Sequence, residues 1–203
     1  MVATGVRKQR AAQTEADLKA AAVRVFARVG YLNAKITDIT AEAGRATGLF
    51  YQHFTGKEKL LEALLTDLLA EGDANAVLPG HGTDFSDRHA VRWHVALYWG
   101  FYRRHRTVMD ALQQAATVDP EFARVSRDML EPDLRHIAGH LDGFELPGDP
   151  LVLASLFTAL VSSFATTWLG DNHPDLGREL GDDEAIETLT SFVWAGLGGG
   201  SRS

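Results

Sequence analysis

The chain has 203 residues, of which 45% are hydrophobic and 23% charged, a balance typical of a folded globular protein with one large or two small domains. It contains no cysteine, which excludes disulfides and thiolate metal sites and favours a reducing compartment, the cytoplasm. The net charge of −7 is unevenly spread, because residues 1–60 carry ten Lys and Arg against five Asp and Glu. We therefore expect a basic N-terminal part that meets a polyanion and an acidic body with another role.

The first predicted helix covers residues 18–29, where apolar side chains recur at helical spacing and form one face. Thr14 is its predicted N-cap, with Asp17 three residues later as an acidic variant of the capping box, and Gly30 is predicted to end it. The preceding segment VRKQR contains no apolar stretch, so we do not expect a secretory signal. This basic arm either follows a DNA backbone or reaches the minor groove, or it is a disordered tail.

Three more helices are predicted in the basic part, at residues 36–43, 47–54 and 57–71. A tight turn at Gly44 separates the first two, and the second of these is barely two turns long. Two short helices joined by a tight turn indicate a helix-turn-helix. The leucines of 57–71 recur at helical spacing and form an apolar stripe that can pack against this pair.

The predicted helix at 47–54 has one face suited to reading bases. With about 100° between successive residues, Phe50 and Phe54 point toward the core. The residues that face away are Gly48, Leu49, Gln52 and His53, with Tyr51 at the boundary. A glutamine can bond adenine through two hydrogen bonds, an aliphatic side chain can contact the thymine methyl group, and a glycine permits close approach of the backbone. This pattern predicts a recognition helix for duplex DNA.

The segment ITDITAEAGRATGLFYQHFTGKEKLL, residues 36–61, resembles the DNA-binding signature of the TetR family of transcriptional regulators. The matching positions are Ile36, Ile39, Gly44, Gly48, Phe50, Tyr51, His53, Phe54, Lys57 and Glu58. For base contacts, the resemblance implies the positions Thr37, Thr47, Gly48, Leu49, Tyr51 and Gln52. For phosphate contacts, it implies Tyr51, His53 and Lys57. The alternative for His53 is a structural histidine, and the alternative for Lys57 is a solvated surface position.

Three basic residues of this segment raise particular expectations. Lys35 stands where the family often has Thr or Ser, and Arg45-Ala46 stands where it often has Val-Ser, so both helix caps should be weak. We expect Lys35 and Arg45 to add phosphate contacts instead. Lys57 stands at the predicted start of a helix, where a cation opposes the helix dipole. An external phosphate would explain that placement.

Beyond residue 60, helices are predicted at 87–105, 107–117, 121–142, 150–169 and 183–197, with no convincing strand, so the predicted class is all-α. We place a helix-turn-helix domain at 1–56 and an effector-binding and dimerisation domain at 57–203. The stretch from Leu151 to Gly170 is uncharged and long enough to cross a bilayer. Its six hydroxyl residues and acidic flanks favour a buried helix and no membrane association.

The resemblance implies that the body binds a small molecule and dimerises through its last two long helices, here 150–169 and 183–197. Apolar stripes on both helices suit a four-helix interface between two subunits. The predicted dimer contacts are Phe157, Leu160, Phe164, Ile186, Leu189 and Val193. The alternative is that these helices pack only within one chain.

An effector pocket is predicted among the aromatic and neighbouring residues of the body. The candidates are Trp93, His94, Tyr98, Trp99, Tyr102, Met109, Gln113, Phe122 and Phe164. Such stripes also suit a plain core, but as a pocket they favour an apolar or aromatic effector. The cluster RRHR at 103–106 either offsets a helix dipole or binds an anionic ligand such as a coenzyme A thioester.

The sequence lacks the common catalytic motifs: a P-loop, G-x-S-x-G and H-E-x-x-H. His136 and His140 share a helical face near Asp133, but without further ligands we predict neither a metal site nor a cofactor. We therefore expect a homodimeric, ligand-released repressor that binds a pseudo-palindromic operator, and not an enzyme. The alternative is a helical binding protein or enzyme whose basic head is only structural.

Overall fold

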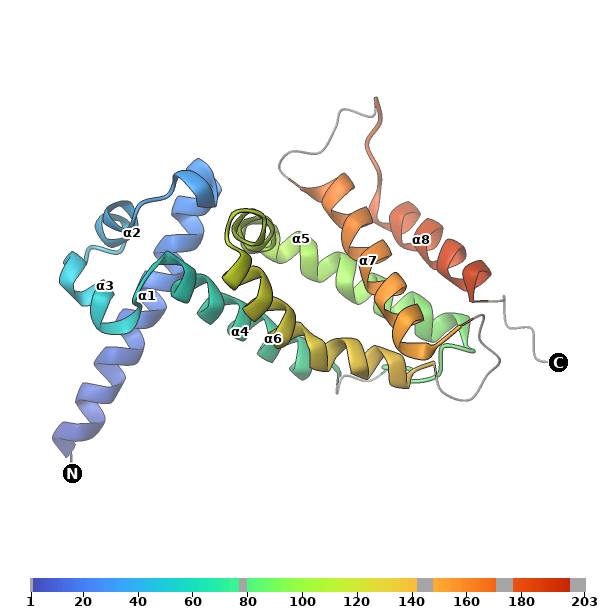
Figure 1. The fold of residues 1–203 in the computed structure, drawn as a ribbon, viewed down its shortest axis with the longest axis horizontal. Coiled ribbons are helices and arrows are strands. Elements are labelled where there is room, and N and C mark those ends of the chain that lie inside the picture. The colour runs from blue at the N-terminus through green and yellow to red at the C-terminus, as the bar shows by residue number, and fades with distance from the viewer. Residues whose placement is uncertain (1, 77–79, 142–147, 171–176, 198–203) are drawn as a thin grey trace. The chain divides into compact units, whose positions relative to one another are not determined.

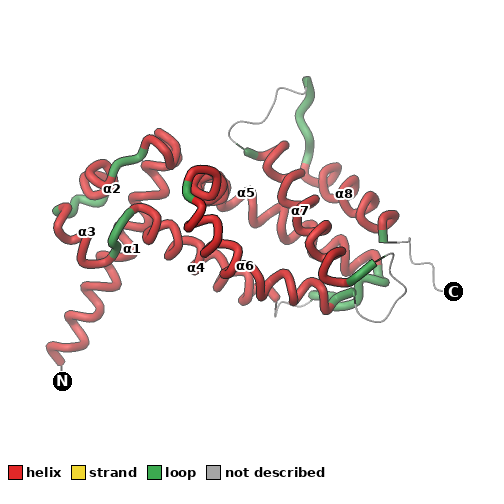
Figure 2. Tube along the Cα trace, viewed as in Figure 1, coloured by secondary structure: helices red, strands yellow, loops and turns green. Residues whose placement is uncertain are grey.

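The computed structural model describes residues 2–76, 80–141, 148–170 and 177–197, and its regular structure in these ranges is entirely helical (Figure 2). The helices are α1 (Val2–Asn33), α2 (Ile36–Glu42), α3 (Thr47–His53), α4 (Lys57–Ala76), α5 (Arg88–Val118), α6 (Pro120–Gly139), α7 (Pro150–Leu169) and α8 (Asp182–Gly196) (Figure 1). The predicted all-α class is confirmed for the described part of the chain.

The chain forms two compact units. Unit 1 consists of Met1–Leu69 and Thr107–Ser126, and unit 2 of Ala70–Arg106 and Arg127–Ser203. Helices α4, α5 and α6 each contribute residues to both units. The domain boundary predicted after residue 56 stays a prediction.

Unit 1 is organised around the apolar face of α1 that the sequence predicts. Leu18, Ala21, Ala22 and Val25 on this face have no exposed surface. Ile39 of α2, Phe50 of α3 and the pair Leu60 and Leu61 of α4 are equally buried. Because each large apolar side chain contributes roughly 1.5–3 kcal/mol when it leaves water, this shared core stabilises helices that are too short to persist alone.

Ion pairs at the surface of unit 1 hold α2 and α4 against α1. Glu42 of α2 accepts hydrogen bonds from Arg24 at 2.7 Å and from Arg28 at 3.3 Å, and these hydrogen bonds lower the pKa of its carboxyl group. Lys19 of α1 donates to Asp67 of α4 at 2.9 Å. Pairs this exposed add little stability, so their role is to orient the short helices.

Helix α1 begins at Val2, twelve residues before the predicted N-cap Thr14, and it includes the basic arm. Thr14 is therefore not an N-cap, because its hydroxyl donates to the carbonyl of Arg10 one turn earlier at 2.9 Å. No residue between them breaks the helix, and pairs such as Gln13 with Asp17 at 2.8 Å support it. The helix is interrupted at Gly30, where its end is predicted, because the backbone there is not helical (φ 74°, ψ 160°), and a short helical segment continues to Asn33.

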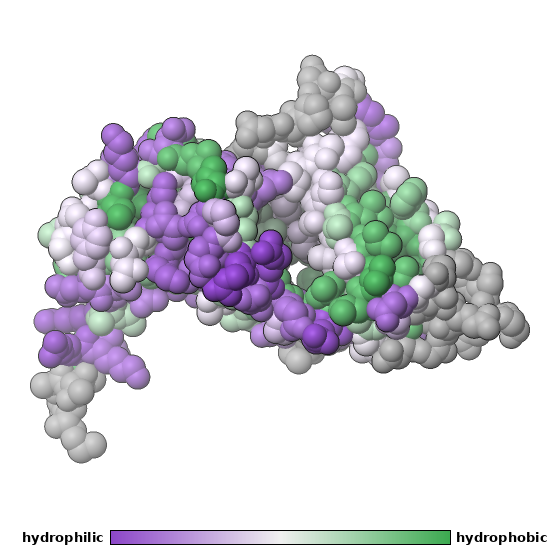
Figure 3. Space-filling view, viewed as in Figure 1, coloured by the Kyte–Doolittle hydropathy of each residue, from purple (hydrophilic) through white to green (hydrophobic). Residues whose placement is uncertain are grey.

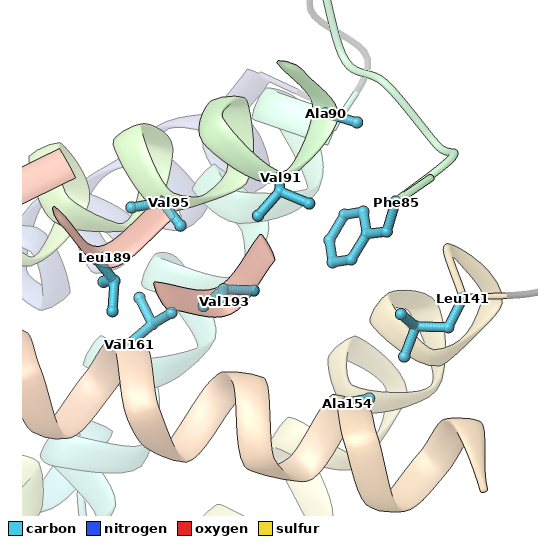
Figure 4. Packing of buried hydrophobic residues seen from close by; sticks show 9 residues of the cluster. All are labelled: Phe85, Ala90, Val91, Val95, Leu141, Ala154, Val161, Leu189 and Val193. Atoms are coloured by element: carbon cyan, nitrogen blue, oxygen red, sulfur yellow. The ribbon is translucent and has the colours of Figure 1, made fainter. Parts of the chain in front are cut away.

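Unit 2 has its own apolar core between α5, α7 and α8 (Figure 4). Val91 and Val95 of α5 lie beside Val161 of α7 and Val193 of α8, and all four are at most 6% exposed. The predicted break between helices 87–105 and 107–117 is present as a kink in α5, since the backbone at His105 has non-helical angles (φ −109°, ψ 17°). No glycine or proline stands there to end the helix.

Helix α7 has the predicted limits, and Asp149 caps its start by accepting from the backbone N–H of Leu151 at 2.9 Å and of Val152 at 3.2 Å. By length and composition α7 can span a membrane, and 17% of its most apolar 18-residue window is buried within the chain. The core helix of a globular protein meets the same criteria. The predicted burial of α7 is therefore not reached within one subunit.

Candidate DNA-binding surface

Helix α3 has a buried and an exposed side, and the helical wheel places Phe50, Phe54, Gly48 and Gln52 correctly, whereas Leu49 and His53 are half-buried. Phe50 and Phe54 are 0% and 6% exposed, so their predicted place in the core is confirmed. Tyr51 is 57% exposed, and Gln52 is exposed on the same helix. The ring of Phe50 contacts the rings of Tyr51 and Phe54 edge-on or at a tilt, each with centroids 5.6 Å apart. The buried rings of Phe50 and Phe54 thus fix the helix so that Tyr51 and Gln52 face solvent.

The other predicted base-contacting positions have mixed exposure. Thr37 of α2 and Gly48 of α3 are exposed, whereas Thr47 and Leu49 are half-buried. The hydroxyls of Thr40 and Thr47 lie 3.3 Å apart, which links α2 to the start of α3. The structure therefore brings the N-terminal half of α3 and the start of α2 into one small surface region.

The turn between α2 and α3 is tight, and both helices have weak caps as expected. Gly44 has a φ of 62°, a left-handed conformation that favours glycine, and the N–H of Arg45 donates to the carbonyl of Thr40 at 2.9 Å. Neither Lys35 nor Ala46 forms a side-chain cap, because neither side chain has an acceptor atom. At α2, the N–H of Lys35 instead donates to Asp38 at 3.3 Å.

Two cations predicted to contact phosphate differ in their surroundings. Lys35 is exposed at the start of α2. Arg45 donates to Asp17 of α1 at 2.5 Å, and this pairing lowers the pKa of the Asp17 carboxyl group. The pair anchors the turn to α1, so Arg45 can reach a phosphate only if it leaves Asp17. Its phosphate contact stays a prediction.

Lys57 is half-buried in unit 1. Its ammonium donates to the carbonyls of Tyr31 at 2.8 Å and Ala34 at 3.2 Å, and it sits 4.2 Å above the centre of the Tyr31 ring. Burial lowers the pKa of this ammonium. The end of α1 thus supplies the negative partner that the sequence analysis sought in an external phosphate. The argument for phosphate contact from its placement is wrong, and only the family resemblance supports that role.

Replacing Lys57 with methionine should lower the free energy of unfolding of unit 1 by about 1–2 kcal/mol, because two charge-assisted hydrogen bonds are lost. Thermal unfolding followed by circular dichroism measures this change. Lys59→Met is the matched control, since Lys59 is exposed and pairs with Glu62 at the surface at 2.8 Å. Equal melting temperatures for the two variants would contradict the structural role of Lys57.

His53 occupies an intermediate position at the end of α3. Its side chain is 13% exposed, and its Nδ1 lies 3.9 Å from a carboxylate oxygen of Glu15 in α1. A structural contact is therefore available to it, while its phosphate contact stays a prediction.

The predicted effector residues are divided between the two units. Met109, Gln113 and Phe122 belong to unit 1, and the other six belong to unit 2. Trp99 is buried and donates through Nε1 to Asp182 at 2.7 Å, and its ring centre lies 5.8 Å from that of Phe164. Gln113 is exposed. A common pocket for all nine residues stays a prediction.

Within unit 2, the predicted effector residues differ in burial. Tyr102 is buried, whereas Trp93 and Tyr98 are half-buried. Burial raises the pKa of Tyr98 to about 12, so its phenol stays neutral. His94, expected to orient a ligand, is buried and has two histidine neighbours, His81 and His140.

The predicted dimer contacts lie mainly on the inner side of α7 and α8. Leu189 and Val193 are 3% and 6% exposed in the core of unit 2, so little of their surface is left for a second subunit, and their interface role stays a prediction. Phe157, Leu160, Phe164 and Ile186 are half-buried and pack against the same core. Periodicity identified an apolar face correctly, but the chain itself covers that face.

One contact in unit 1 was missed by sequence reasoning. The side-chain oxygen of Gln114 in α5 accepts from the backbone N–H of Tyr31 at 3.1 Å and of Leu32 at 3.4 Å. These groups follow the non-helical Gly30, where α1 leaves its own hydrogen-bond ladder. The sequence places Gln113 and Gln114 side by side, with no signal to single out the second.

Comparison with known proteins bears on this surface. The family described as "Bacterial regulatory proteins, tetR family" matches residues 18–64. These residues contain α2, α3, the second half of α1 and the start of α4. The transcriptional repressor NicS of Pseudomonas putida is 36% identical over 104 residues, which are 50% of this chain and 48% of NicS. The transcriptional activator FasR of Mycolicibacterium smegmatis is 25% identical over 89% of this chain and 81% of its own. Residues 18–64 therefore form a domain of the tetR regulatory family.

Solved structures share the TetR fold over most of the chain. A TetR-family regulator from a Rhodococcus species has a TM-score of 0.71 at 18% identity and covers 92% of this chain and 99% of its own. FadR from Bacillus subtilis, in complex with stearoyl-CoA, has a TM-score of 0.66 at 14% identity and covers 89% and 98%. At such low identities the likeness establishes the fold alone. The alignment with NicS covers about half of that relative's length.

Proposed function

We propose that the protein is a cytoplasmic, homodimeric transcriptional regulator that places α3 in the major groove of an operator and releases DNA when a small molecule binds. The observation that carries this proposal is the division of α3 between buried Phe50 and Phe54 and exposed Tyr51 and Gln52. A polar, glycine-containing face held by an aromatic core is what a recognition helix requires. The repressor NicS supports repression, and the activator FasR leaves activation as the other outcome.

The basic part of α1 provides further contacts with the DNA backbone. Arg7, Lys8 and Arg10 are exposed on a helix that extends past α2 and α3 in unit 1 (Figure 1). With Lys35, these cations can neutralise phosphates beside the groove that α3 enters. Such contacts position the protein without reading sequence, and they make binding depend strongly on salt.

Replacing Gln52 with alanine should relax base preference by about 1–3 kcal/mol at one operator position and leave the salt dependence unchanged. Selection of duplexes from a random pool by the wild type and the variant, followed by sequencing, measures this preference. Lys35→Ala is the matched control, because losing a phosphate contact should weaken binding to all sequences. The assignment of Gln52 fails if both proteins select the same bases with the same stringency.

The outer face of α7 and α8 supports dimerisation. Val152 and Leu156 of α7 are 56% and 60% exposed, and Phe192 of α8 is 67% exposed. Figure 3 shows an apolar area where these helices lie. Apolar faces of this kind on two neighbouring helices are normally covered, and a second subunit with the same two helices covers them symmetrically.

For the effector, the aromatic side chains of α5 favour an apolar or aromatic molecule. FadR, a protein of this fold, is solved in complex with stearoyl-CoA, which joins an apolar acyl chain to an anionic coenzyme A group. The RRHR cluster supports an anionic ligand less well, because Arg103 pairs with Asp182, and Arg104 donates to Glu71 at 3.2 Å. In this proposal the effector binds unit 2 and stabilises one of two arrangements of α4. Helix α4 is the element that changes because it carries residues of both units.

A further inference from the structure

Three histidine rings from three separate segments converge in unit 2. His81 precedes α5, His94 lies in α5, and His140 follows α6. The Nε2 atom of His81 is 3.2 Å from Nε2 of His94 and 3.0 Å from Nε2 of His140. His94 and His140 are 7% and 3% exposed, and His81 is half-buried. The three Nε2 atoms therefore meet at one largely enclosed point.

Backbone contacts determine which nitrogen of two of these rings carries the proton. Nδ1 of His94 lies 2.9 Å from the carbonyl of Ala90, and Nδ1 of His140 lies 2.8 Å from the carbonyl of His136. A carbonyl can only accept, so each Nδ1 must donate. In the neutral rings, the Nε2 atoms of His94 and His140 then carry no proton. Each offers a lone pair within 3.2 Å of Nε2 of His81.

His81 cannot satisfy both lone pairs. Its Nε2 carries at most one proton, so at least one of the two short nitrogen–nitrogen contacts lacks a well-aimed donor. Three ring nitrogens with too few protons between them thus face a common centre, and a cation there would satisfy all three.

We propose that His81, His94 and His140 bind one divalent transition-metal ion of the zinc type through their Nε2 atoms. Two nitrogens bound to zinc at about 2.0–2.1 Å with tetrahedral angles are about 3.3 Å apart, close to the two short contacts. Neutral imidazole is a preferred ligand of Zn²⁺ and of related ions such as Co²⁺ and Ni²⁺. Three protein ligands leave a coordination position for water or for a donor atom of a small molecule.

The surroundings of the three rings resemble those of a metal site. The Nδ1–carbonyl hydrogen bonds of His94 and His140 are outer contacts of the kind that orient metal-bound imidazoles. The ring of Phe85 lies 4.9 Å from His94 and 5.3 Å from His140, measured between centres, and forms an apolar wall. On the other side, the ring of Trp93 lies 4.9 Å from that of His81. These contacts hold the rings in place and limit access by water.

The loop Gly80-His81-Gly82 is shaped to bring His81 against α5. Gly80 has a φ of 92°, which side chains other than glycine rarely adopt, and a Cβ atom on Gly82 would lie 2.7 Å from Cβ of Ala90. Both glycines thus serve the close approach of the loop. By sequence spacing, His140 pairs with His136, whose exposed ring stacks on His81 with ring centres 5.7 Å apart. Among the described residues, ligand atoms converge from His81, His94 and His140.

The test uses the full chain without a histidine tag, titrated with Zn²⁺ by calorimetry and with Co²⁺ by visible absorption, in the absence of DNA. We expect one ion per subunit and the intense visible bands of tetrahedral Co²⁺. His81→Ala and His140→Phe should each weaken Zn²⁺ binding by at least about a hundredfold, because loss of an outer contact alone costs 10–100-fold. The control is His89→Ala, whose side chain is 93% exposed five residues before His94. It should bind as the wild type does.

Circular dichroism and thermal melting check that each variant folds. If His140→Phe does not fold, His81→Ala alone tests the proposal, because His81 lies in a loop. Equal Zn²⁺ affinity for the wild type and His81→Ala overturns the proposal, as does a wild type that binds no ion or binds Co²⁺ only in octahedral form. The site does not depend on DNA recognition, so either proposal can fail while the other holds.

Discussion

Replacing Phe50 with alanine is expected to destabilise unit 1 by about 3–5 kcal/mol, a large fraction of the roughly 5–15 kcal/mol that stabilises a typical domain. Phe50 has no exposed surface and is the main anchor of the seven-residue helix α3. A helix this short does not persist without tertiary contacts. Thermal unfolding and amide hydrogen exchange of α2 and α3 measure the loss, and DNA binding should disappear with it.

Tyr51→Ala is the matched control, because Tyr51 is the next residue in the same helix and is 57% exposed. It should leave the melting temperature within a few degrees of the wild type but weaken binding to all DNA sequences, as loss of a phosphate contact does. Phe50 and Tyr51 thus separate stability from recognition within one helix. Similar effects of the two substitutions on stability and on binding would mean that α3 does not have a buried and a DNA-facing side.

The second large effect is expected from charge placed on the outer face of α7 and α8. Leu156→Asp and Phe192→Asp should convert the protein from a dimer to a monomer of 22.1 kDa. An aspartate at either position puts two like charges into a symmetric apolar interface. Light scattering coupled to size-exclusion chromatography measures the mass. Affinity for a palindromic operator should fall about 10²–10⁴-fold, because the α3 helices of two subunits are no longer joined in one dimer.

Leu130→Asp provides the comparison for this experiment, since Leu130 of α6 is also an exposed apolar residue, at 45%. It should remain dimeric and bind DNA as the wild type does. A wild type that is monomeric at micromolar concentration, or Leu156→Asp and Phe192→Asp variants that stay dimeric, would place the interface elsewhere.

The sequence predicted the arrangement of unit 1 well because its signals are local. The spacing of Leu18, Val25 and Phe26 along α1 and of Phe50 and Phe54 along α3 determines which sides are buried, whatever covers them. The start of α1 was missed because Thr14 suggested an N-cap. The residues before Thr14 can all adopt a helix, so α1 continues through Thr14 to Val2.

Errors in the body arose where the answer depends on neighbours distant in sequence. Periodicity showed that Leu189 and Val193 share an apolar face, but not that their own chain covers it while Phe192 stays exposed. Likewise, the partner of Lys57 is a pair of carbonyls more than twenty residues earlier. The histidine cluster joins positions 81, 94 and 140, and only the pair at 136 and 140 has a spacing visible in sequence.

The most direct test of the central claim, that a dimer presents α3 of each subunit to duplex DNA, is hydroxyl-radical footprinting on a duplex selected by the wild-type protein. We expect two protected regions on one face of the duplex, about one helical turn or slightly more apart, and an affinity that falls steeply as salt rises. Protection of a single region, or a protein that leaves all duplexes unprotected even at low ionic strength, would contradict the account.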